Sequence, residues 1–340
     1  MRFRTLMAAA VLVLGSAATA RADNVTIQGA GATFPYPLYA RWIAEYQKAH
    51  PELRINYQAI GSGGGIRQLL AQTVDFGASD TPMSDAEIAK LPGGVVHIPA
   101  TLGAVVVSYN LPGVAGLRLD AKLLAELFSG RISRWNDPAL KGLNAALTLP
   151  DLPVVVVVRA DGSGTTALFT EYLAATNPSW AQSVGMGKSV RFPVGLGAKG
   201  NEGVTAQLKS VKGSIGYIEL AYARQNQLAM ADLGNRAGRF VAPSFVSILA
   251  AAQAKSSALP ADLRLSILDA AGPDSYPIAA FSYLLLPRTP RAPEKLQSLK
   301  AFVSWALTTG QPLGASLDYA PLPQAVVQRG QELLSTLGKP

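Results

Sequence analysis

The sequence predicts an α/β protein built as two lobes, and three observations support this prediction. Of its 340 residues, 49% are hydrophobic and 15% are charged, which is the composition of a folded protein. That length is too great for one small core and suits two lobes. Strand-like, glycine-rich and helix-like segments also follow one another three times, and this alternation is typical of α/β layers.

Residues 1–22 have the features of a secretory signal peptide. Arg2 and Arg4 give a basic start, residues 6–15 form a short apolar run, and Ala20-Arg21-Ala22 matches a small-x-small cleavage site. The apolar run is too short for a stable membrane span, and no later stretch reaches the roughly 20 apolar residues that a span needs. We therefore expect cleavage near Ala22 and a soluble mature chain in the periplasm, with full secretion as the alternative.

Composition and charge exclude several classes of function. The chain holds 30 Lys and Arg against 22 Asp and Glu, with three of the arginines in the signal segment. The basic residues are scattered, so we expect no nucleic-acid partner. There is no cysteine, which excludes disulfides, thiolate metal sites and a cysteine nucleophile. The acidic residues and the two histidines form no ligand pattern, so we expect no metal and no cofactor.

The first predicted unit is a strand over residues 25–28, a glycine-rich turn over 29–32 and a helix from about Pro35. Proline suits the first turn of a helix. One face of this helix is apolar at helical spacing. Its residues are Tyr39, Trp42, Ile43 and Tyr46.

Two similar units follow. Residues 53–60 alternate like a strand and lead into the turn 61–65 and a helix through Leu69 and Leu70. Residues 154–159 form a β-branched run, which is typical of a strand buried on both faces in a parallel sheet. The turn 161–164 and a further helix follow that run. The inward face of that helix holds Leu168, Phe169, Tyr172 and Leu173.

Two more elements are predicted near the end of the chain. Residues 283–287 form an apolar strand. A last helix should span residues 293–308 and turn Phe302 and Trp305 inward.

The three glycine-rich turns predict an anion site. Each turn places unpaired backbone N–H groups and a partial positive charge of roughly half a unit at the start of a helix. Such helix ends bind anions readily. The hydroxyl groups of Thr33, Ser62, Ser163 and Thr165 could add donors. For any one of these residues alone, a plain helix cap or tight turn is the favoured alternative; three such turns in one chain favour the anion site.

Two charged residues sharpen this prediction. Arg159 ends a predicted strand, and the carboxyl ends of strands face the ligand crevice in an α/β sheet. Its guanidinium could hold two oxygens of a tetrahedral oxyanion. Asp161 could form a structural ion pair with Arg159, orient it toward a ligand, or do both. Asp80 ends another strand-like segment. It could simply cap the next segment, but Ser84 with Glu87 makes a better capping box for that purpose.

Seven short motifs stand in order along nearly the whole mature chain. They are Gly29-Ala-Gly-Ala-Thr-Phe-Pro35, Gly61-Ser-Gly-Gly-Gly65, Asp75-Phe-Gly-Ala-Ser-Asp80, Arg159-Ala-Asp-Gly-Ser-Gly-Thr165, Gly195-Leu-Gly-Ala-Lys-Gly-Asn201, Gly213-Ser-Ile-Gly-Tyr217 and Leu317-Asp-Tyr-Ala-Pro-Leu-Pro323. In combination they resemble the phosphate-binding proteins of high-affinity bacterial phosphate ABC transporters. The match is weakest over residues 228–270.

The resemblance implies a fold, a function and partners. The fold is the two-lobed type II periplasmic-binding-protein fold, with a mixed, mainly parallel sheet and flanking helices in each lobe and the ligand in the cleft between them. Lobe I would hold residues 23–101 and 278–340, and lobe II residues 102–277. The chain would bind inorganic phosphate as a monomer, without catalysis. It would deliver the phosphate to a membrane ABC permease with its ATPase subunits.

The resemblance also implies the site residues. The predicted phosphate ligands are Thr33, Phe34, Ser62, Asp80, Arg159, Ser163, Gly164 and Thr165. Most would donate from backbone N–H or hydroxyl groups, and Arg159 would add charge-assisted bonds. Asp161 would orient Arg159 from behind, and Asp80 would accept a hydrogen bond from the ligand.

Asp80 also predicts the selectivity of the site. Phosphate near neutral pH still carries a proton, whereas sulfate is fully ionised. A buried carboxylate repels an oxyanion unless that anion donates a proton to it. Our hypothesis is that Asp80 accepts the proton of phosphate and excludes sulfate.

Three alternatives remain. A phosphate-ester hydrolase would use Ser163 as its nucleophile, but residues 160–164 lack the first glycine of a nucleophile elbow, and neither His50 nor His97 lies beside a catalytic-looking motif. A receptor of the same fold for sulfate or molybdate conflicts with Asp80. A secreted adhesion protein is the third, and exposed aromatic patches would favour it.

Overall fold

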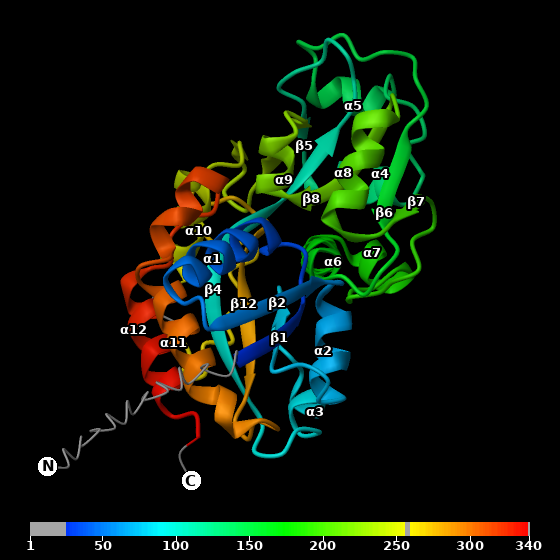
Figure 1. Cartoon of the computed structure of the whole chain (residues 1–340). Coiled ribbons are helices and arrows are strands. Elements are labelled where there is room, and N and C mark those ends of the chain that lie inside the picture. The colour runs from blue at the N-terminus through cyan, green and yellow to red at the C-terminus, as the bar shows by residue number, and fades with distance from the viewer. Residues whose placement is uncertain (1–24, 256–258, 339–340) are drawn as a thin grey trace, which may run out of the picture.

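The computed structural model describes residues 25–255 and 259–338. Within them, nine strands form one mixed sheet in the order β2-β1-β3-β12-β4-β8-β6-β7, with β9 also paired to β4. A three-stranded sheet, β11-β10-β5, lies apart from it. Figure 1 shows two bodies with helices around their strands, joined by the long strand β4. The predicted signal peptide lies outside the described residues.

The strands are short except for β4 and β12. They are β1 (Val25–Gly31), β2 (Leu53–Ala59), β3 (Phe76–Ser79), β4 (Val95–Tyr109), β5 (Arg118–Leu119), β6 (Val155–Arg159), β7 (Leu196–Ala198), β8 (Ser214–Glu219), β9 (Ala229–Met230), β10 (Asp232–Gly234), β11 (Phe240–Val241) and β12 (Ala279–Pro287).

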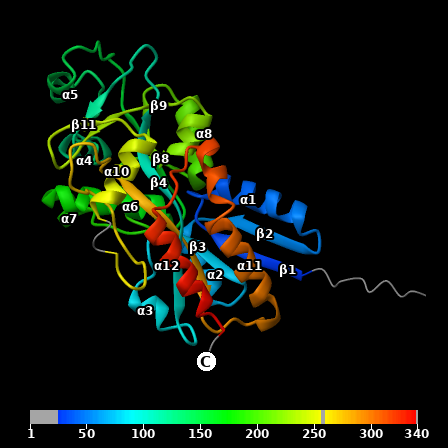
Figure 2. The same cartoon turned by 90° about the vertical axis from the view of Figure 1, so that its left-hand side faces the viewer.

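The helices flank both halves of the sheet (Figure 2). They are α1 (Tyr36–Ala49), α2 (Ser62–Leu70), α3 (Asp85–Ile88), α4 (Ala121–Phe128), α5 (Pro138–Leu143), α6 (Gly164–Thr176), α7 (Pro178–Ser183), α8 (Gly200–Ser210), α9 (Leu220–Gln225), α10 (Phe245–Ala254), α11 (Leu296–Leu307) and α12 (Gln324–Ser335), with 3₁₀ turns η2 (Pro293–Lys295) and η3 (Gln311–Leu317).

Strand β4 connects the two halves of the sheet. All 15 of its residues are buried. Its first part, residues 95–104, pairs antiparallel with β12, and its second part, residues 105–109, pairs antiparallel with β8. The predicted change of lobe at residues 101 and 102 falls inside β4, and the one at residues 277 and 278 falls just before β12.

The sheet is mixed, as predicted. Its parallel pairs are β1 with β2 and β3, and β6 with β7 and β8. The antiparallel pairs come from β4 and β12, which run through the middle of the sheet. The carboxyl ends of parallel neighbours lie at the same edge of a sheet, so the segments that follow β1 and β3 emerge together.

The predicted strand-turn-helix units form, with two corrections to their boundaries. Residues 29–31, predicted as a turn, belong to β1 because their neighbour β3 packs closely on them: a β-carbon on Gly29 would lie 2.1 Å from the Phe76 ring. Helix α2 begins at Ser62, so Gly61 precedes it as the N-cap and the other glycines of the predicted turn, residues 63–65, lie in its first turn. One of them, Gly65, lets α2 pack on β1, since its β-carbon would lie 2.4 Å from the Cα of Gly31.

The helices bury the faces that the sequence predicts. In α1, Tyr39, Trp42 and Tyr46 are buried and Ile43 is half-buried. The indole N–H of Trp42 donates to the Gly310 carbonyl at 2.7 Å, which ties α1 to the C-terminal part of the chain. The predicted inward residues of α6 are also buried; they are Leu168, Phe169, Tyr172 and Leu173.

The C-terminal prediction was partly wrong. Residues 293–295 form a 3₁₀ turn, and α11 follows it. In α11, Phe302 is buried and Trp305 is half-buried. Helix α12 comes after α11, so α11 is not the last helix. The buried residues of α12, which are Val326, Gly330 and Leu334, are four apart and form a narrow stripe on an otherwise polar helix. Within the described part of the chain, no helix is both long and apolar enough to span a membrane.

Candidate anion-binding site

The predicted site residues lie where strands end and helices begin. Thr33 and Phe34 follow β1, Ser62 starts α2 after β2, and Asp80 follows β3 directly. Arg159 is the last residue of β6, and residues 163–165 open α6. All eight predicted ligand residues are buried.

Four buried backbone N–H groups point to a ligand. They belong to Phe34, Ser62, Gly164 and Thr165, and within residues 25–255 and 259–338 none of them has a hydrogen-bond acceptor in the protein. Buried backbone N–H groups in folded proteins are nearly always paired. Those of Ser62, Gly164 and Thr165 lie in the first turn of α2 or α6, where helices leave donors unpaired. The cluster is therefore suited to a ligand that accepts hydrogen bonds.

The two bodies of the molecule meet at this cluster. The N–H of Gly63 in α2 donates to the carbonyl of Gly162 at 2.8 Å. A β-carbon on Gly164 would lie 2.3 Å from the Ser62 hydroxyl oxygen and 2.4 Å from Oδ2 of Asp80. Glycine is required at position 164 because any side chain would push the start of α6 away from Asp80.

Arg159 is held by Asp161 in a two-point ion pair. Nε donates to Oδ1 at 2.7 Å and Nη2 donates to Oδ2 at 2.5 Å, while Nη1 donates to the Thr165 hydroxyl at 3.2 Å. The Arg159 side chain is only 1% exposed. Burial alone would raise the pKa of Asp161, but the bonds from Arg159 and from the Gly200 N–H keep that pKa below its ordinary value. Asp161 is therefore ionised and fixes the plane of the guanidinium.

Asp80 is a buried carboxyl with two hydroxyl partners. Ser282 donates to Oδ1 at 2.8 Å, and Ser62 donates to Oδ2 at 3.3 Å. Burial raises the pKa of Asp80 to about 7, although the Ser282 bond, the charge of Arg159 and the Ser62 bond act in the opposite direction. Asp80 can therefore gain or lose a proton near neutral pH.

Ser163 caps helix α6, as the simpler alternative for this residue predicts. Its hydroxyl oxygen accepts from the Thr166 N–H at 3.0 Å, and its own N–H donates to the Lys188 carbonyl at 2.8 Å. A hydroxyl that accepts one bond keeps its hydrogen for another partner. The capping role is therefore compatible with a contact to a ligand.

Two residues of the cluster were missed from sequence. Ser282 lies in β12 at a register shift between it and the next residue, and its neighbours in the strand are mostly apolar. A lone serine in an otherwise apolar strand was the one feature of the sequence that could have pointed to Ser282. Asn201 belongs to a motif quoted for the resemblance but had no assigned role; its side-chain nitrogen lies 2.8 Å from the Thr33 hydroxyl oxygen and 3.2 Å from that of Thr165.

The histidines take structural positions. The His50 ring stacks on Tyr46 at the end of α1. His97 is buried and accepts the Met83 N–H at 3.0 Å. No described hydrogen bond joins either ring to Ser163. Among the residues that the structure places, no group of three histidine or acidic side chains could hold a metal ion.

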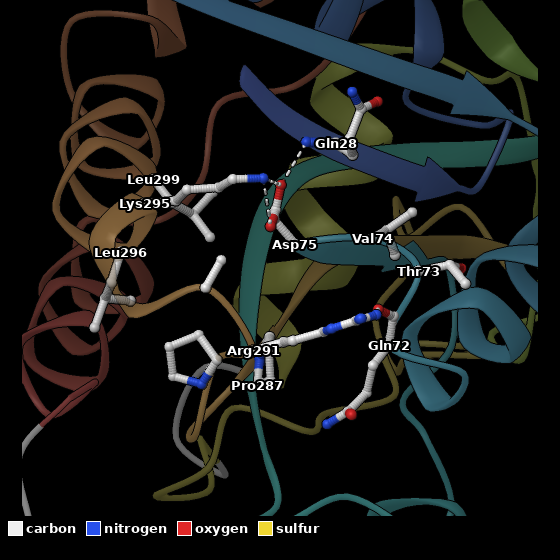
Figure 3. A pocket seen from close by; sticks show the side chains of 12 residues that line it. Gln28, Gln72, Thr73, Val74, Asp75, Pro287, Arg291, Lys295, Leu296 and Leu299 are labelled. Atoms are coloured by element: carbon white, nitrogen blue, oxygen red, sulfur yellow. Dashed lines mark hydrogen bonds and ion pairs between the residues drawn. The ribbon is translucent and has the colours of Figure 1, made fainter. Parts of the chain in front are cut away.

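A cavity of about 270 Å³ lies beside β1 and α11, and none of the predicted ligands lines it (Figure 3). Its charged groups bond within the protein. Lys295 lies 3.2 Å from the Asp75 carboxylate, which also accepts the Gln28 N–H at 2.7 Å, and Arg291 donates to the Gln72 carbonyl at 3.2 Å. Since its cations already have partners, this cavity is a poorer anion site than the cluster around Asp80.

Comparison with known proteins places the chain in a family. A model described as the PBP superfamily domain matches residues 16–309. The phosphate-binding protein PstS of Pasteurella multocida is 44% identical over 96% of this chain and 94% of its own length, and that of Haemophilus influenzae is 46% identical over 93% and 94%. Among solved structures, a high-affinity periplasmic phosphate-binding protein (PfluDING) bound with phosphate has a TM-score of 0.70 at 22% identity, covering 93% of this chain and 100% of that one. The chain therefore belongs to the PBP superfamily and, within it, to the family of the phosphate-binding proteins named PstS.

Proposed function

We propose that this protein binds one inorganic phosphate ion between its two bodies and delivers it to an ABC importer. The observation that supports this most is the set of four buried, unpaired N–H groups beside Arg159 and Asp80. Such donors suit the oxygens of a tetrahedral anion in a site that excludes water. The eight predicted residues would be its ligands.

Asp80 would recognise the proton of phosphate. Each of the other seven predicted ligands can donate to phosphate, whereas an ionised carboxylate can only accept. A phosphate that donates its O–H to Asp80 gains a strong charge-assisted bond. A fully ionised oxyanion places two acceptors against each other instead, which is unfavourable in a buried site.

Closure would follow from contacts to both bodies. Ser62 and Asp80 belong to the part of the sheet formed by β1, β2 and β3, and Arg159 and Thr165 to the part formed by β6, β7 and β8. A ligand that contacts both parts favours the closed arrangement over an open one. We infer that the hinge lies where β4 and β12 cross between the bodies, close to the predicted boundaries.

The cellular role rests on the family and on the predicted signal peptide. We infer that the mature chain is a periplasmic monomer that presents phosphate to a membrane permease with its ATPase subunits, and that it performs no catalysis. The relatives named above are binding proteins by name, and residues 1–22 match an export signal.

Calorimetry of the purified mature chain tests the proposal. Phosphate should bind with a stoichiometry of one, arsenate should compete because it can carry the same proton, and sulfate should not. A chain that binds sulfate as tightly as phosphate, or neither anion, would refute the proposed function. Hydrolysis of a chromogenic phosphate ester would refute the inference that there is no catalysis.

A further inference from the structure

Asn201 lies at the centre of the candidate site, in the first turn of α8. It is fully buried. Its Oδ1 accepts the backbone N–H of Glu219 at 2.9 Å. A backbone N–H can only donate, so the atom that faces it must be the amide oxygen, and Nδ2 faces the other way. The two hydrogens of Nδ2 are thereby directed at Thr33 and Thr165, whose hydroxyl oxygens lie 2.8 and 3.2 Å away.

These contacts determine what the Thr33 hydroxyl can do. A hydroxyl has two lone pairs and one hydrogen. The Thr33 oxygen accepts from Nδ2 of Asn201 and also from the Asn201 backbone N–H at 3.2 Å. An amide NH₂ group and a backbone N–H can only donate, so both lone pairs of the Thr33 hydroxyl are occupied. Its hydrogen is then the one group left for another partner.

The same reasoning holds for Thr165 in the other body. Its hydroxyl oxygen accepts from Nη1 of Arg159 and from Nδ2 of Asn201, each at 3.2 Å. A guanidinium and an amide NH₂ group are donors alone. The Thr165 hydroxyl is therefore also restricted to donating, and one side chain fixes the direction of both hydroxyls.

We propose that Asn201 is a positioning residue that turns the hydroxyls of Thr33 and Thr165 into obligate donors toward the anion. This inference rests on the proposed function and deepens it. Neither threonine hydroxyl then has a lone pair free to accept the ligand's proton, so that proton is left to Asp80. The N–H of Gly200 donates to Asp161, which anchors the start of α8 on the Arg159 ion pair and holds Asn201 in register with it.

A double-mutant cycle separates this role from a structural one. Asn201→Ala should weaken phosphate binding by roughly 10- to 100-fold, as expected for two misdirected hydroxyls in a buried site. In a Thr33→Val, Thr165→Val background there is no hydroxyl left to direct, so the same change should alter phosphate affinity by less than about 2-fold. An equal loss in both backgrounds, or unchanged affinity in the single variant, would overturn the inference.

Two further variants, Asn201→Asp and Asn144→Ala, test whether loss of folding explains the weaker phosphate binding. Asn201→Asp keeps an oxygen for the Glu219 N–H but replaces the donor with an acceptor, so the hydroxyls turn toward position 201. We expect it to fold and to bind phosphate at least about 100-fold more weakly. Wild-type affinity in this variant would overturn the inference.

Asn144→Ala is the matched control, because Asn144 is a buried asparagine that bonds to the backbone of Arg118 and Leu140 outside the site. It should lower thermal stability and leave phosphate affinity at the wild-type value. A similar loss of affinity in this control would show that general destabilisation explains the result, and would overturn the role of Asn201.

The experiments also separate failure of this inference from failure of the proposed function. A wild-type chain that does not bind phosphate overturns both. A wild-type chain that binds phosphate, with additive effects in the double-mutant cycle, overturns the Asn201 inference alone.

Discussion

Replacing Asp80 by asparagine should remove the dependence of anion selectivity on pH. Burial raises the pKa of this carboxyl to about 7. Sulfate brings no proton, so it can enter the wild-type site only when Asp80 has taken a proton from solvent. Phosphate brings its own proton and can bind to ionised Asp80. The two anions therefore respond differently when the pH rises above the pKa of Asp80.

The magnitude follows from the cost of protonating Asp80. Each pH unit above the pKa costs about 1.4 kcal/mol, which is a factor of about 10 in affinity. The ratio of phosphate to sulfate affinity in the wild type should rise about 10-fold per unit above pH 7. An asparagine at position 80 does not titrate and can donate an N–H to sulfate. In Asp80→Asn the ratio should stay flat above neutral pH, where phosphate is mostly in its singly protonated form, and it should fall well below the wild-type ratio.

Competition calorimetry between about pH 6 and 9 measures this ratio directly. The matched control is Asp75→Asn, because Asp75 is a half-buried carboxylate that pairs with Lys295 and lines the cavity beside β1 and α11, which none of the predicted ligands lines. That variant should keep the wild-type ratio and its pH dependence. A wild-type ratio that does not change with pH, or an Asp80→Asn ratio that changes as steeply as the wild type, would refute the reasoning.

Three further changes test other parts of the structure. Gly164→Ala should cost roughly 10- to 100-fold in phosphate affinity by calorimetry, because the new β-carbon would lie 2.4 Å from Oδ2 of Asp80; wild-type affinity would contradict the closed geometry. Arg159→Lys should cost roughly 100-fold, because an ammonium cannot reproduce the two-point pair, and an equal affinity would refute that role. Burial lowers the pKa of His97 to about 4 from 6.5, so the unfolded chain takes up this proton first as the pH falls. The free energy of unfolding in urea should fall by about 3 kcal/mol more for the wild type than for His97→Gln between pH 6.5 and 4. The glutamine retains an acceptor for the Met83 N–H. Parallel pH profiles of the two proteins would show that His97 does not cause the pH dependence.

Local patterns predicted the elements that local physics determines. The β-branched run ending at Arg159 and the apolar face around Trp42 have fixed periods, so their strand and helix could be found without the structure. Glycine carries no such period, which is why Gly29 to Gly31 were predicted as a turn. Their strand conformation depends on partners more than 40 positions away that need the space of the missing side chains: the Phe76 ring at Gly29 and the Ala78 backbone at Gly31.

The residues of the candidate site also fall into those that local sequence patterns predict and those that depend on distant contacts. Helix starts are local features, so the donors around Ser62 and Gly164 were found from sequence. The bond from Ser282 to Asp80 joins residues 202 positions apart, and the bond from Asn201 to Thr33 joins residues 168 apart. Such contacts depend on strand register and on how the two bodies meet, and a serine or asparagine carries no sequence pattern that reports them.

The charges around the site show how such a cluster can hold an anion without a net positive charge. Asp161 is ionised and paired with Arg159 through two bonds, so this pair contributes no net charge. Asp80 adds negative charge when it is ionised. The chain's formal charge of +8 lies mostly elsewhere, on scattered residues whose effect salt screens. Lys188 also acts electrostatically on Asp80 and offsets part of its negative charge. Most of the attraction then comes from N–H and O–H dipoles, which are strong at contact distance in a dry site and weak beyond it. Dipoles of fixed direction distinguish ligands by where each oxygen lies and which one carries a proton. A cluster that relied on cations would instead hold sulfate at least as well as phosphate.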